Sequence, residues 1–303
     1  MFNRLPPLVL GPLALTLYLV NTALWCLPIY ALVLVRLLVP VPSWRDRCIR
    51  WSIHLAEGWI RGTNFLTDHL YRLNWEFLGE TDLRRDRWYL VVANHQSWVD
   101  IMALLQTFRN RIPFPKFFSK REMLWVPFLG PAIWALEFPI MRRYAPEVLK
   151  KHPEWRGRDL EATRRACGRF HQAPVTIVNF LEGTRFTAEK HSRQESPYRH
   201  LLRPRAGGAA LALAGMEGKI RTLLDLTIVY PDGVPTFWGF LCGRVRRLSV
   251  QLRSVNVPEE FQRGDYLNDQ DFRQRFQGWI DGLWREKDGT IARRLKEETP
   301  RLL

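Results

Sequence analysis

Hydrophobic positions follow two different patterns near the start of the chain. Residues Leu5 to Val35 contain no Asp, Glu, Lys or Arg, and this 31-residue run exceeds the roughly 20 apolar residues that cross a bilayer. The next segment, Trp44 to Leu73, repeats large apolar side chains at mostly helical spacing among arginines. This pattern predicts an interfacial helix, or two helices broken near Gly62, and an ordinary core-packing helix is the alternative.

The apolar run allows more than one arrangement. Its prolines, Pro6, Pro7, Pro12 and Pro28, favour breaks, so it is either a single kinked span or a re-entrant hairpin. A cleaved signal peptide fits less well, because the run continues into Arg36 and shows no small-residue cleavage site. The arginines that follow place this flank in the cytoplasm by the positive-inside tendency. Membrane attachment is therefore the first expectation.

From Asn74 onward, strand-length apolar runs alternate with helical or polar segments. This alternation predicts an α/β domain over residues 74–303, with a central mostly parallel or mixed sheet flanked by helices, after a membrane-associated helical unit over residues 1–73. The expected strands are Trp88–Ala93, Phe138–Met141, Val175–Leu181, Leu223–Tyr230 and Arg247–Arg253. The expected helices are Ser97–Phe108, Arg158–Gln172, Ala206–Met216 and Asp269–Glu298.

The charge indicates which class of partner the protein binds, and the cysteines indicate the redox state of its compartment. The 303 residues carry 45 Lys and Arg against 30 Asp and Glu, and this formal charge of +15 predicts an anionic partner. Nucleic acid, a phospholipid surface, a phosphorylated substrate and an acidic carrier protein all satisfy that condition. The four cysteines form no C-x-x-C pair, which argues against a disulfide framework or a zinc ribbon and fits a reducing compartment. The seven histidines lack tight ligand spacing, so we expect no metal.

Candidate chemistry begins where the first buried strand ends. The strand runs into N-H-Q-S-W-V-D, residues 94–100, and open α/β sheets bind ligands at the carboxyl ends of their strands. If His95 lies on the incoming turn, the Asp100 carboxylate can hold its ring and leave the other nitrogen to take a proton from a hydroxyl. Ser97 is expected to cap the following helix, and a covalent nucleophile is the less favoured interpretation of this residue.

A second motif, Glu182-Gly183-Thr184-Arg185, follows the strand expected over Val175–Leu181. Its glycine lets backbone approach a ligand, and its arginine suits bidentate contact with phosphate. N-H-x4-D followed about 80 residues later by E-G-T-R closely resembles the glycerolipid and lysophospholipid acyltransferase family, best known from bacterial 1-acylglycerol-3-phosphate acyltransferases of the PlsC type. The resemblance covers about residues 88–231, and these two motifs are its specific part.

Other segments resemble further parts of this family. The sequence F-S-K-R-E-M at 118–123 is similar to its lysine-bearing segment, which here contains Lys120. The sequence P-I-M-R at 139–142 is similar to a short strand that ends in a phosphate-binding arginine. Arg143 follows Arg142 directly, so the resemblance leaves open which of them binds. Residues 202–208 and 226–230 (L-T-I-V-Y) are similar to the subfamily with a "vTivY" strand in place of the fourth motif.

The resemblance implies a glycerol-3-phosphate acyltransferase-like fold and a membrane-bound enzyme. His95, oriented by Asp100, would deprotonate the sn-2 hydroxyl of 1-acylglycerol-3-phosphate, which attacks acyl-CoA or acyl carrier protein thioester to give phosphatidate. Glu182 would either orient Arg185 or bind glycerol. No cofactor is expected beyond the acyl co-substrate. The residues expected to hold the acceptor's phosphate are Arg185, Thr184, Gly183, Glu182, Arg142 or Arg143, and Lys120.

Alternative functions fit parts of the same sequence. The motifs recognise a phosphate or an equivalent anion, so lysophosphatidylglycerol, lyso-ornithine lipid or another lysolipid is an alternative acceptor. The charge and the thirteen tryptophans also fit a membrane-tethered nucleic-acid-binding protein, although the chain carries no nucleic-acid motif. The expected partners are therefore lysophospholipid, acyl thioester, membrane lipid and, as a further candidate, acyl carrier protein. The expected location is the cytoplasmic face of a bacterial inner membrane.

Overall fold

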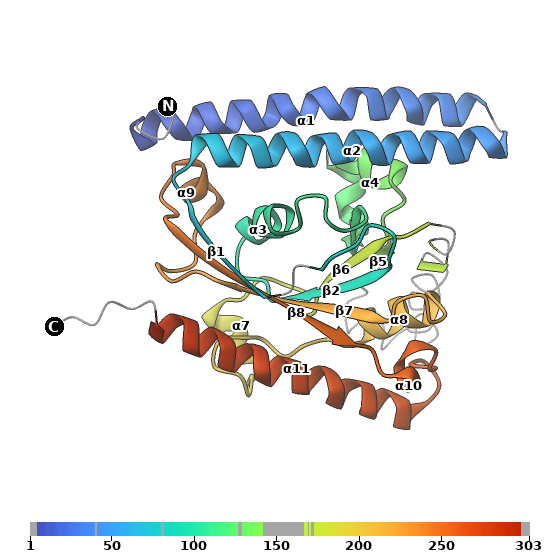
Figure 1. The fold of residues 1–303 in the computed structure, drawn as a ribbon, viewed down its shortest axis with the longest axis vertical. Helices are drawn as coiled ribbons and strands as arrows, with labels where there is room; N and C mark the ends of the chain where they lie inside the picture. The colour runs from blue at the N-terminus through green and yellow to red at the C-terminus, as the bar shows by residue number, and fades with distance from the viewer. Residues whose placement is uncertain are drawn as a thin grey trace.

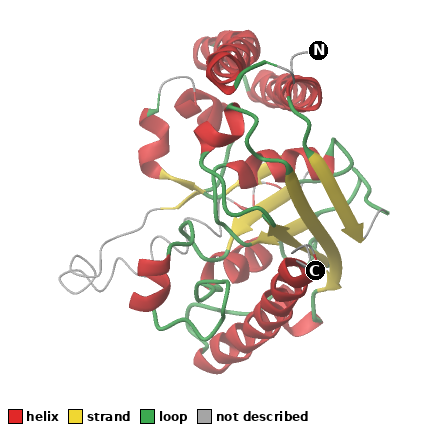
Figure 2. Ribbon diagram, turned by 90° about the vertical axis from the view of Figure 1, so that its left-hand side faces the viewer, coloured by secondary structure: helices red, strands yellow, loops and turns green. Residues whose placement is uncertain are grey.

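The fold is a mixed sheet between two layers of helices, seen in a computed structural model that describes residues 5–39, 41–79, 82–126, 129–141, 167–168, 170 and 173–297 (Figure 1). One layer contains α1 (Pro7–Leu38), α2 (Pro42–Leu70), α3 (Val99–Phe108), α4 (Leu129–Ala135) and α9 (Phe237–Leu241). The other contains α7 (Ala188–Arg193), α8 (Gly207–Gly215), α10 (Glu259–Gln262) and α11 (Gln270–Glu297). Figure 2 shows α1 and α2 almost end-on, on one side of the sheet.

The main sheet has six strands in the order β1-β8-β7-β2-β6-β3. Its central strand β2 pairs in parallel with both β6 and β7, whereas β7 and β8 are antiparallel. Ala93 pairs with Phe180 and with Leu226, so β2 and β6 end level with each other beside β7. The predicted α/β class with a mixed central sheet is confirmed. The strands are β1 (Asn74–Gly79), β2 (Tyr89–Ala93), β3 (Pro115–Phe117), β6 (Thr176–Phe180), β7 (Thr222–Val229) and β8 (Arg247–Asn256).

Most expected elements are present, with shifted bounds. A small second sheet pairs β4 (Ser119–Lys120) with β5 (Ile140–Met141), next to the short 3-10 helix Arg121–Trp125. The sequence did not predict β1 or β3, which lie at the two edges of the main sheet. Edge strands lack the continuous buried run by which β2 was recognised, because β1 is only partly buried and β3 is three residues long. Most of the helix expected over Arg158–Gln172 lies outside the described residues.

The first two helices are each continuous, which decides between the alternatives that the sequence left open. Helix α1 runs through Pro12 and Pro28 without a break, so the apolar segment is one helix and not a hairpin. Helix α2 runs through Gly62 to Leu70, so this segment is one helix and not two. The two helices lie side by side along most of their length (Figure 1).

Gly58 and Gly62 lie inside α2 where this helix packs against α1. A Cβ on Gly58 would lie 2.4 Å from the Trp25 ring, and a Cβ on Gly62 would lie 2.1 Å from Asn21 Oδ1. Residues four apart share one face of a helix, so the pair leaves room for side chains of α1. Asn21 uses this approach to donate from Nδ2 to the Trp59 carbonyl at 3.2 Å. The glycines thus mark a helix contact.

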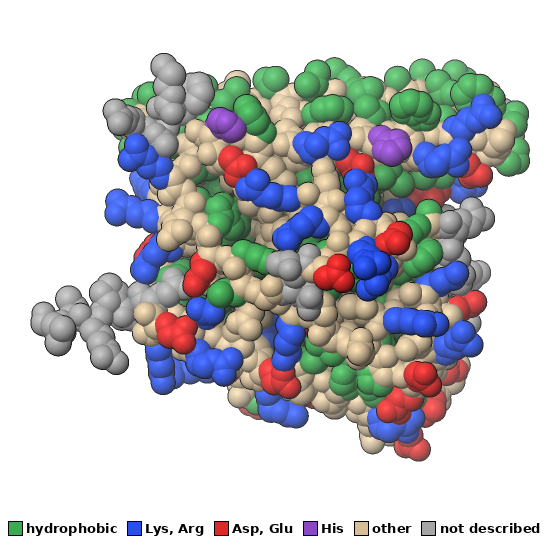
Figure 3. Space-filling model, viewed as in Figure 1, with side chains coloured by type: hydrophobic (Ala, Val, Ile, Leu, Met, Phe, Trp, Pro, Cys, Tyr) green, Lys and Arg blue, Asp and Glu red, His purple; other side chains and the backbone are tan. Residues whose placement is uncertain are grey.

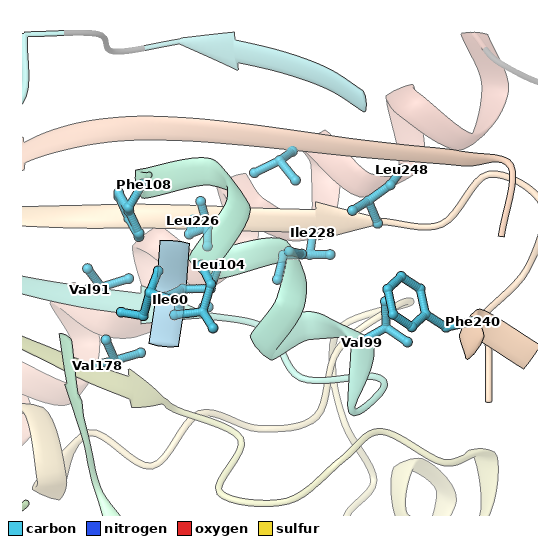
Figure 4. Packing of buried hydrophobic residues seen from close by; sticks show 14 of the residues in the cluster. Ile60, Val91, Val99, Leu104, Phe108, Val178, Leu226, Ile228, Phe240 and Leu248 are labelled. Carbon is cyan, nitrogen blue, oxygen red and sulfur yellow. The ribbon is translucent and has the colours of Figure 1, made fainter. Parts of the chain in front are cut away.

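The hydrophobic core is divided by the sheet. On the side of α2 and α3, Figure 4 shows Ile60, Val91, Leu104 and Leu226 packed together. The intervening residues of β2 point to the other side and pack under α8 and α11. The central strand is therefore buried on both faces, which fits its unbroken apolar sequence.

Alanine at two helical glycines should have opposite effects on stability. Gly58→Ala puts a methyl group where the Trp25 ring lies, so we expect α1 to separate from α2 and the thermal unfolding temperature to fall. Gly278→Ala in α11 meets nothing within 4 Å and should stabilise by about 0.5–1 kcal/mol through helix propensity. Thermal unfolding of the full chain in detergent tests both, and an unchanged Gly58→Ala melting curve would contradict the packing role.

Candidate active site

His95 and Asp100 form a hydrogen-bonded pair at the carboxyl end of β2. Nδ1 of His95 lies 2.8 Å from Oδ2 of Asp100. Asp100 sits in the first turn of α3 and is fully buried, whereas the His95 side chain is 16% exposed. Nε2 of His95 makes no hydrogen bond to the described part of the chain, so it is the ring nitrogen open to a ligand. The turn-then-helix geometry expected from the sequence brings the two groups together.

The Asp100 carboxylate accepts hydrogen bonds from four donors. Oδ2 accepts from the Gln96 N–H at 2.6 Å and the Ser97 N–H at 2.9 Å, besides the His95 ring. Oδ1 accepts from the Tyr230 hydroxyl at 2.5 Å. These donors satisfy a carboxylate that has no access to water and fix its orientation toward His95.

Tyr230 is a site residue that the sequence did not assign a role. It ends the expected strand Leu223–Tyr230 and the L-T-I-V-Y segment, and this position at a strand end is the one signal that the sequence offers. Burial, with a further contribution from Asp100, raises the pKa of Tyr230 well above 10. The phenol therefore stays protonated and donates to Asp100 over the whole physiological range.

The backbone of the histidine turn is held on both sides. The His95 carbonyl accepts from the Phe186 N–H at 2.7 Å, and the His95 ring stacks on Phe180 with centroids 4.2 Å apart. The fully buried Asn94 side chain exchanges two hydrogen bonds of 2.9 Å with the backbone of Ile228 in β7. The ring therefore lies on the side of the sheet that faces α2 and α3, because Phe180 packs against that core.

Glu182 is a positioning residue, which corrects its predicted contact with substrate. One carboxylate oxygen accepts from the His95 N–H at 2.8 Å and the other from the Leu202 N–H at 3.0 Å. Glu182 is completely buried, so neither oxygen is available to a phosphate or to glycerol. Burial raises its pKa from the usual 4.5 to about 8, although the two N–H donors lower it. Glu182 joins the second motif to the first through the backbone.

The rest of the second motif turns toward the first. Gly183 has φ of 68°, a left-handed conformation that glycine adopts without strain. The exposed guanidinium of Arg185 lies over the Trp98 ring, 5.1 Å from its centroid. The structure thus brings Gly183, Thr184 and Arg185 beside the histidine turn. The Lys120 side chain, Arg142 and Arg143 lie outside the described residues, so their roles stay predictions.

Ser97 is turned away from His95. Its hydroxyl donates to the Pro235 carbonyl at 2.6 Å and accepts from the Val99 N–H at 3.2 Å. The capping position itself belongs to Trp98, one residue later than predicted. The Ser97 hydroxyl therefore tethers the loop before α9 to the start of α3, and the geometry gives it no nucleophilic role.

Helix α11 supports the site from behind the sheet. Trp284 Nε1 donates to the carbonyl of Leu202, the same residue whose N–H reaches the buried glutamate. Lys287 is almost fully buried, and its ammonium donates to the Leu226 carbonyl at 2.6 Å and lies 2.5 Å from Asp225 Oδ1. Burial lowers the pKa of Lys287, while Asp225 raises it. Trp284 thus holds the Leu202 segment, which contacts Glu182, and Lys287 holds β7, which leads to Tyr230.

The described residues contain no group of three His, Cys, Asp or Glu side chains arranged to hold a metal ion. The site geometry offers His95 Nε2 as a proton acceptor, with the turn of Gly183, Thr184 and Arg185 beside it.

An α/β fold with a His–Asp pair and a glycine turn at adjacent strand ends agrees with the comparisons. The Acyltransferase family model matches residues 74–230, just over half of the chain, and the protein belongs to this family. The fold resembles the crystal structure of the 1-acyl-sn-glycerophosphate acyltransferase PlsC from Thermotoga maritima, with a TM-score of 0.50 at 17% identity. That match covers 98% of this chain and 97% of the other.

Two relatives are similar in sequence. The chain is 25% identical over 211 residues to mouse 1-acyl-sn-glycerol-3-phosphate acyltransferase gamma, covering 66% of this chain and 51% of the relative. It is 24% identical over 185 residues to 1-acyl-sn-glycerol-3-phosphate acyltransferase 3 of Arabidopsis thaliana, covering 56% and 46%. The chain thus spans about half the length of these curated relatives.

Glu182→Gln should make stability less dependent on pH. Because folding raises the pKa of Glu182, the folded chain binds this proton more tightly, and the unfolding free energy falls as pH rises from about 4.5 to about 8. Glutamine does not titrate, so the variant should lack this part of the fall. It should be less stable near pH 5, because an amide offers one acceptor oxygen to two N–H donors. Urea unfolding from pH 5 to 8.5 measures this, and parallel curves for the two proteins would contradict it.

Proposed function

We propose that the protein transfers a fatty acyl group from an acyl thioester to the sn-2 hydroxyl of 1-acylglycerol-3-phosphate, giving phosphatidate. The observation that carries this proposal is the His95–Asp100 pair, whose Nε2 has no partner among the described residues, placed beside the Gly183–Arg185 turn. Membership of the Acyltransferase family and the names of the relatives support the same reaction.

The geometry suits general-base catalysis. Nε2 of His95 takes the proton of the acceptor hydroxyl as its oxygen attacks the thioester carbonyl. A C–O bond then forms, the C–S bond breaks, and the imidazolium returns the proton to the departing thiolate. Asp100 stabilises the imidazolium through Nδ1 and keeps the ring in one tautomer. General-base assistance of this kind supplies on the order of 10²–10⁴ in rate.

The acceptor's phosphate would bind at the second motif. Arg185 presents an exposed guanidinium, Thr184 a hydroxyl, and Gly183 a turn that lets a ligand approach the backbone. Arg142 or Arg143, together with Lys120, would complete the site. Holding the phosphate there places the hydroxyl near His95. Positioning of this kind can lower the activation free energy by roughly 7–11 kcal/mol.

The acyl donor is acyl-CoA or acyl carrier protein, and both are anionic. The formal charge of +15 favours encounter with either of them by long-range attraction. No cofactor enters this mechanism, because the thioester itself supplies the activated acyl group.

We further propose that α1 and α2 attach the protein to the cytoplasmic face of a bacterial inner membrane. Helix α1 is long and apolar enough to cross a bilayer, and Figure 3 shows hydrophobic side chains gathered along α1 and α2 with Lys and Arg below them. Helix α2 carries exposed Arg45, Arg50 and Arg61 beside α1. Arginines distributed along a partner helix favour a pair that lies in the headgroup layer over one that spans. The large apolar side chains of α1 that are more than half exposed are Leu8, Val9, Leu19, Val20, Leu24, Leu27, Leu34, Leu37 and Leu38.

His95→Ala should lower kcat/KM for acyl transfer by about 10²–10⁴ without unfolding the protein, because the ring is partly exposed and acts on the proton. Asp100→Asn should retain more activity, and Tyr230→Phe more still, because the phenol acts only through Asp100. The assay uses purified protein in detergent with labelled acyl-CoA and acyl carrier protein thioesters. His54→Ala, an exposed histidine of α2, is the matched control.

The same assay with a panel of lysolipids tests the acceptor. A site built for a phosphomonoester should prefer lysophosphatidate to lysophosphatidylglycerol, because the monoester carries close to two charges. Preference for a diester or for lyso-ornithine lipid would change the acceptor and leave the acyl-transfer chemistry intact. Absence of transfer to every lysolipid tested, or full activity of His95→Ala, would overturn the proposed function.

Membrane binding should weaken when a charge is placed on the outer face of α1. Leu24 is 63% exposed, so Leu24→Glu should leave the fold intact and reduce sedimentation with phosphatidylglycerol-containing vesicles. Gln274→Glu adds the same charge on exposed α11, in the opposite helix layer, and should bind as the unchanged chain does (Figure 1). Equal sedimentation of all three proteins would show that another surface binds the membrane.

A further inference from the structure

Lys190 on α7 reaches back to the second motif. Its ammonium donates to the Thr184 hydroxyl oxygen at 2.9 Å and to the Arg185 carbonyl at 2.9 Å. Thr187 is the N-cap of α7, and its hydroxyl accepts from the Lys190 N–H at 3.2 Å. This cap fixes the start of the helix, and therefore Lys190, next to the turn. A cation that no sequence motif identified therefore lies against the E-G-T-R turn.

The charge on Lys190 is not neutralised by a neighbouring acid. Both of its acceptors are neutral oxygens, and within the described ranges it forms no ion pair. Its neighbours on α7 behave differently, because Glu189 and Arg193 lie 3.9 Å apart and are both largely exposed. Lys190, by contrast, is only partly exposed. The turn thus carries a positive charge that no acid among the described residues balances.

The two hydrogen bonds also prepare the turn for an anion. An ammonium has three N–H donors. Lys190 uses two of them on the Thr184 hydroxyl and the Arg185 carbonyl, so one remains for a ligand. Because the Thr184 oxygen accepts from Lys190, its own hydrogen is left to be donated to a ligand. The Arg185 carbonyl would repel an anion, and the ammonium covers it.

We infer that Lys190 is a further phosphate-binding cation of the acceptor site, acting beside Arg185 and favouring a phosphomonoester dianion. Each added cation attracts a phosphomonoester, which carries close to two charges, more strongly than a phosphodiester, which carries one. Arg185 is restrained over Trp98 while Lys190 is restrained on the turn itself, so both cations are ordered before the ligand arrives. This inference rests on the proposed function and adds a residue and a selectivity to it.

Steady-state kinetics of Lys190→Met test the inference. We expect KM for lysophosphatidate to rise about tenfold or more, with KM for the acyl thioester and the thermal unfolding temperature unchanged. The ratio of kcat/KM for lysophosphatidate to that for lysophosphatidylglycerol should fall, because the dianion loses more than the monoanion. Lys190→Arg, which keeps the charge, should recover most of this preference. Arg193→Met removes an equal charge from the exposed side of the same helix and is the matched control.

The outcomes separate this inference from the reaction itself. An unchanged KM and an unchanged monoester preference in Lys190→Met would overturn the role of Lys190 while the acyltransferase function stands. A purely structural role would also be shown if Lys190→Met lowered the unfolding temperature and weakened both substrates equally, or if Arg193→Met did the same as Lys190→Met. Absence of lysophosphatidate acylation by the unchanged chain would instead remove the proposed acceptor.

Discussion

A single buried carboxylate sets the requirements that the rest of the site meets. Burying an ionised group without partners is very unfavourable, so Asp100 needs donors on both oxygens. Those donors come from the histidine turn, from the start of α3 and from the end of β7, about 130 residues away in sequence. They coincide only when β2 and β7 pair in the observed register. The orientation of the His95 ring thus depends on the register between β2 and β7.

The site uses two buried acids for different tasks. Asp100 faces the ring of His95 and has four donors, whereas Glu182 faces its backbone and has two. Burial raises the pKa of Glu182, and its two N–H donors offset only part of that rise. One acid prepares the proton acceptor, and the other fixes the distance between the two motifs. The E-G-T-R motif therefore combines one buried structural residue, Glu182, with three partly or fully exposed residues.

The sequence predicted contacts between residues that are close along the chain. It could not predict contacts between residues that are far apart in sequence. The central strands, α3, and the meeting of His95 with Asp100 follow from local patterns, because one turn and one helix turn join them. The contact of Tyr230 with Asp100 depends on strand order, which no local pattern contains. The sequence left a break at Gly62 open for a related reason, since the Asn21 side chain that fills the space beside this glycine belongs to another helix. Residues 142–166 lie outside what the structure describes, so the predicted Arg142 and Arg143 contacts stay predictions.

The bracing of the site by α11 bears on how the protein is made. Lys287 and Trp284 hold β7 and the Leu202 segment, yet the ribosome adds them almost two hundred residues after His95. Contacts so distant in sequence form late and slowly during folding. A nascent chain from which α11 has not yet emerged therefore lacks the contacts that hold β7 and the Leu202 segment in place.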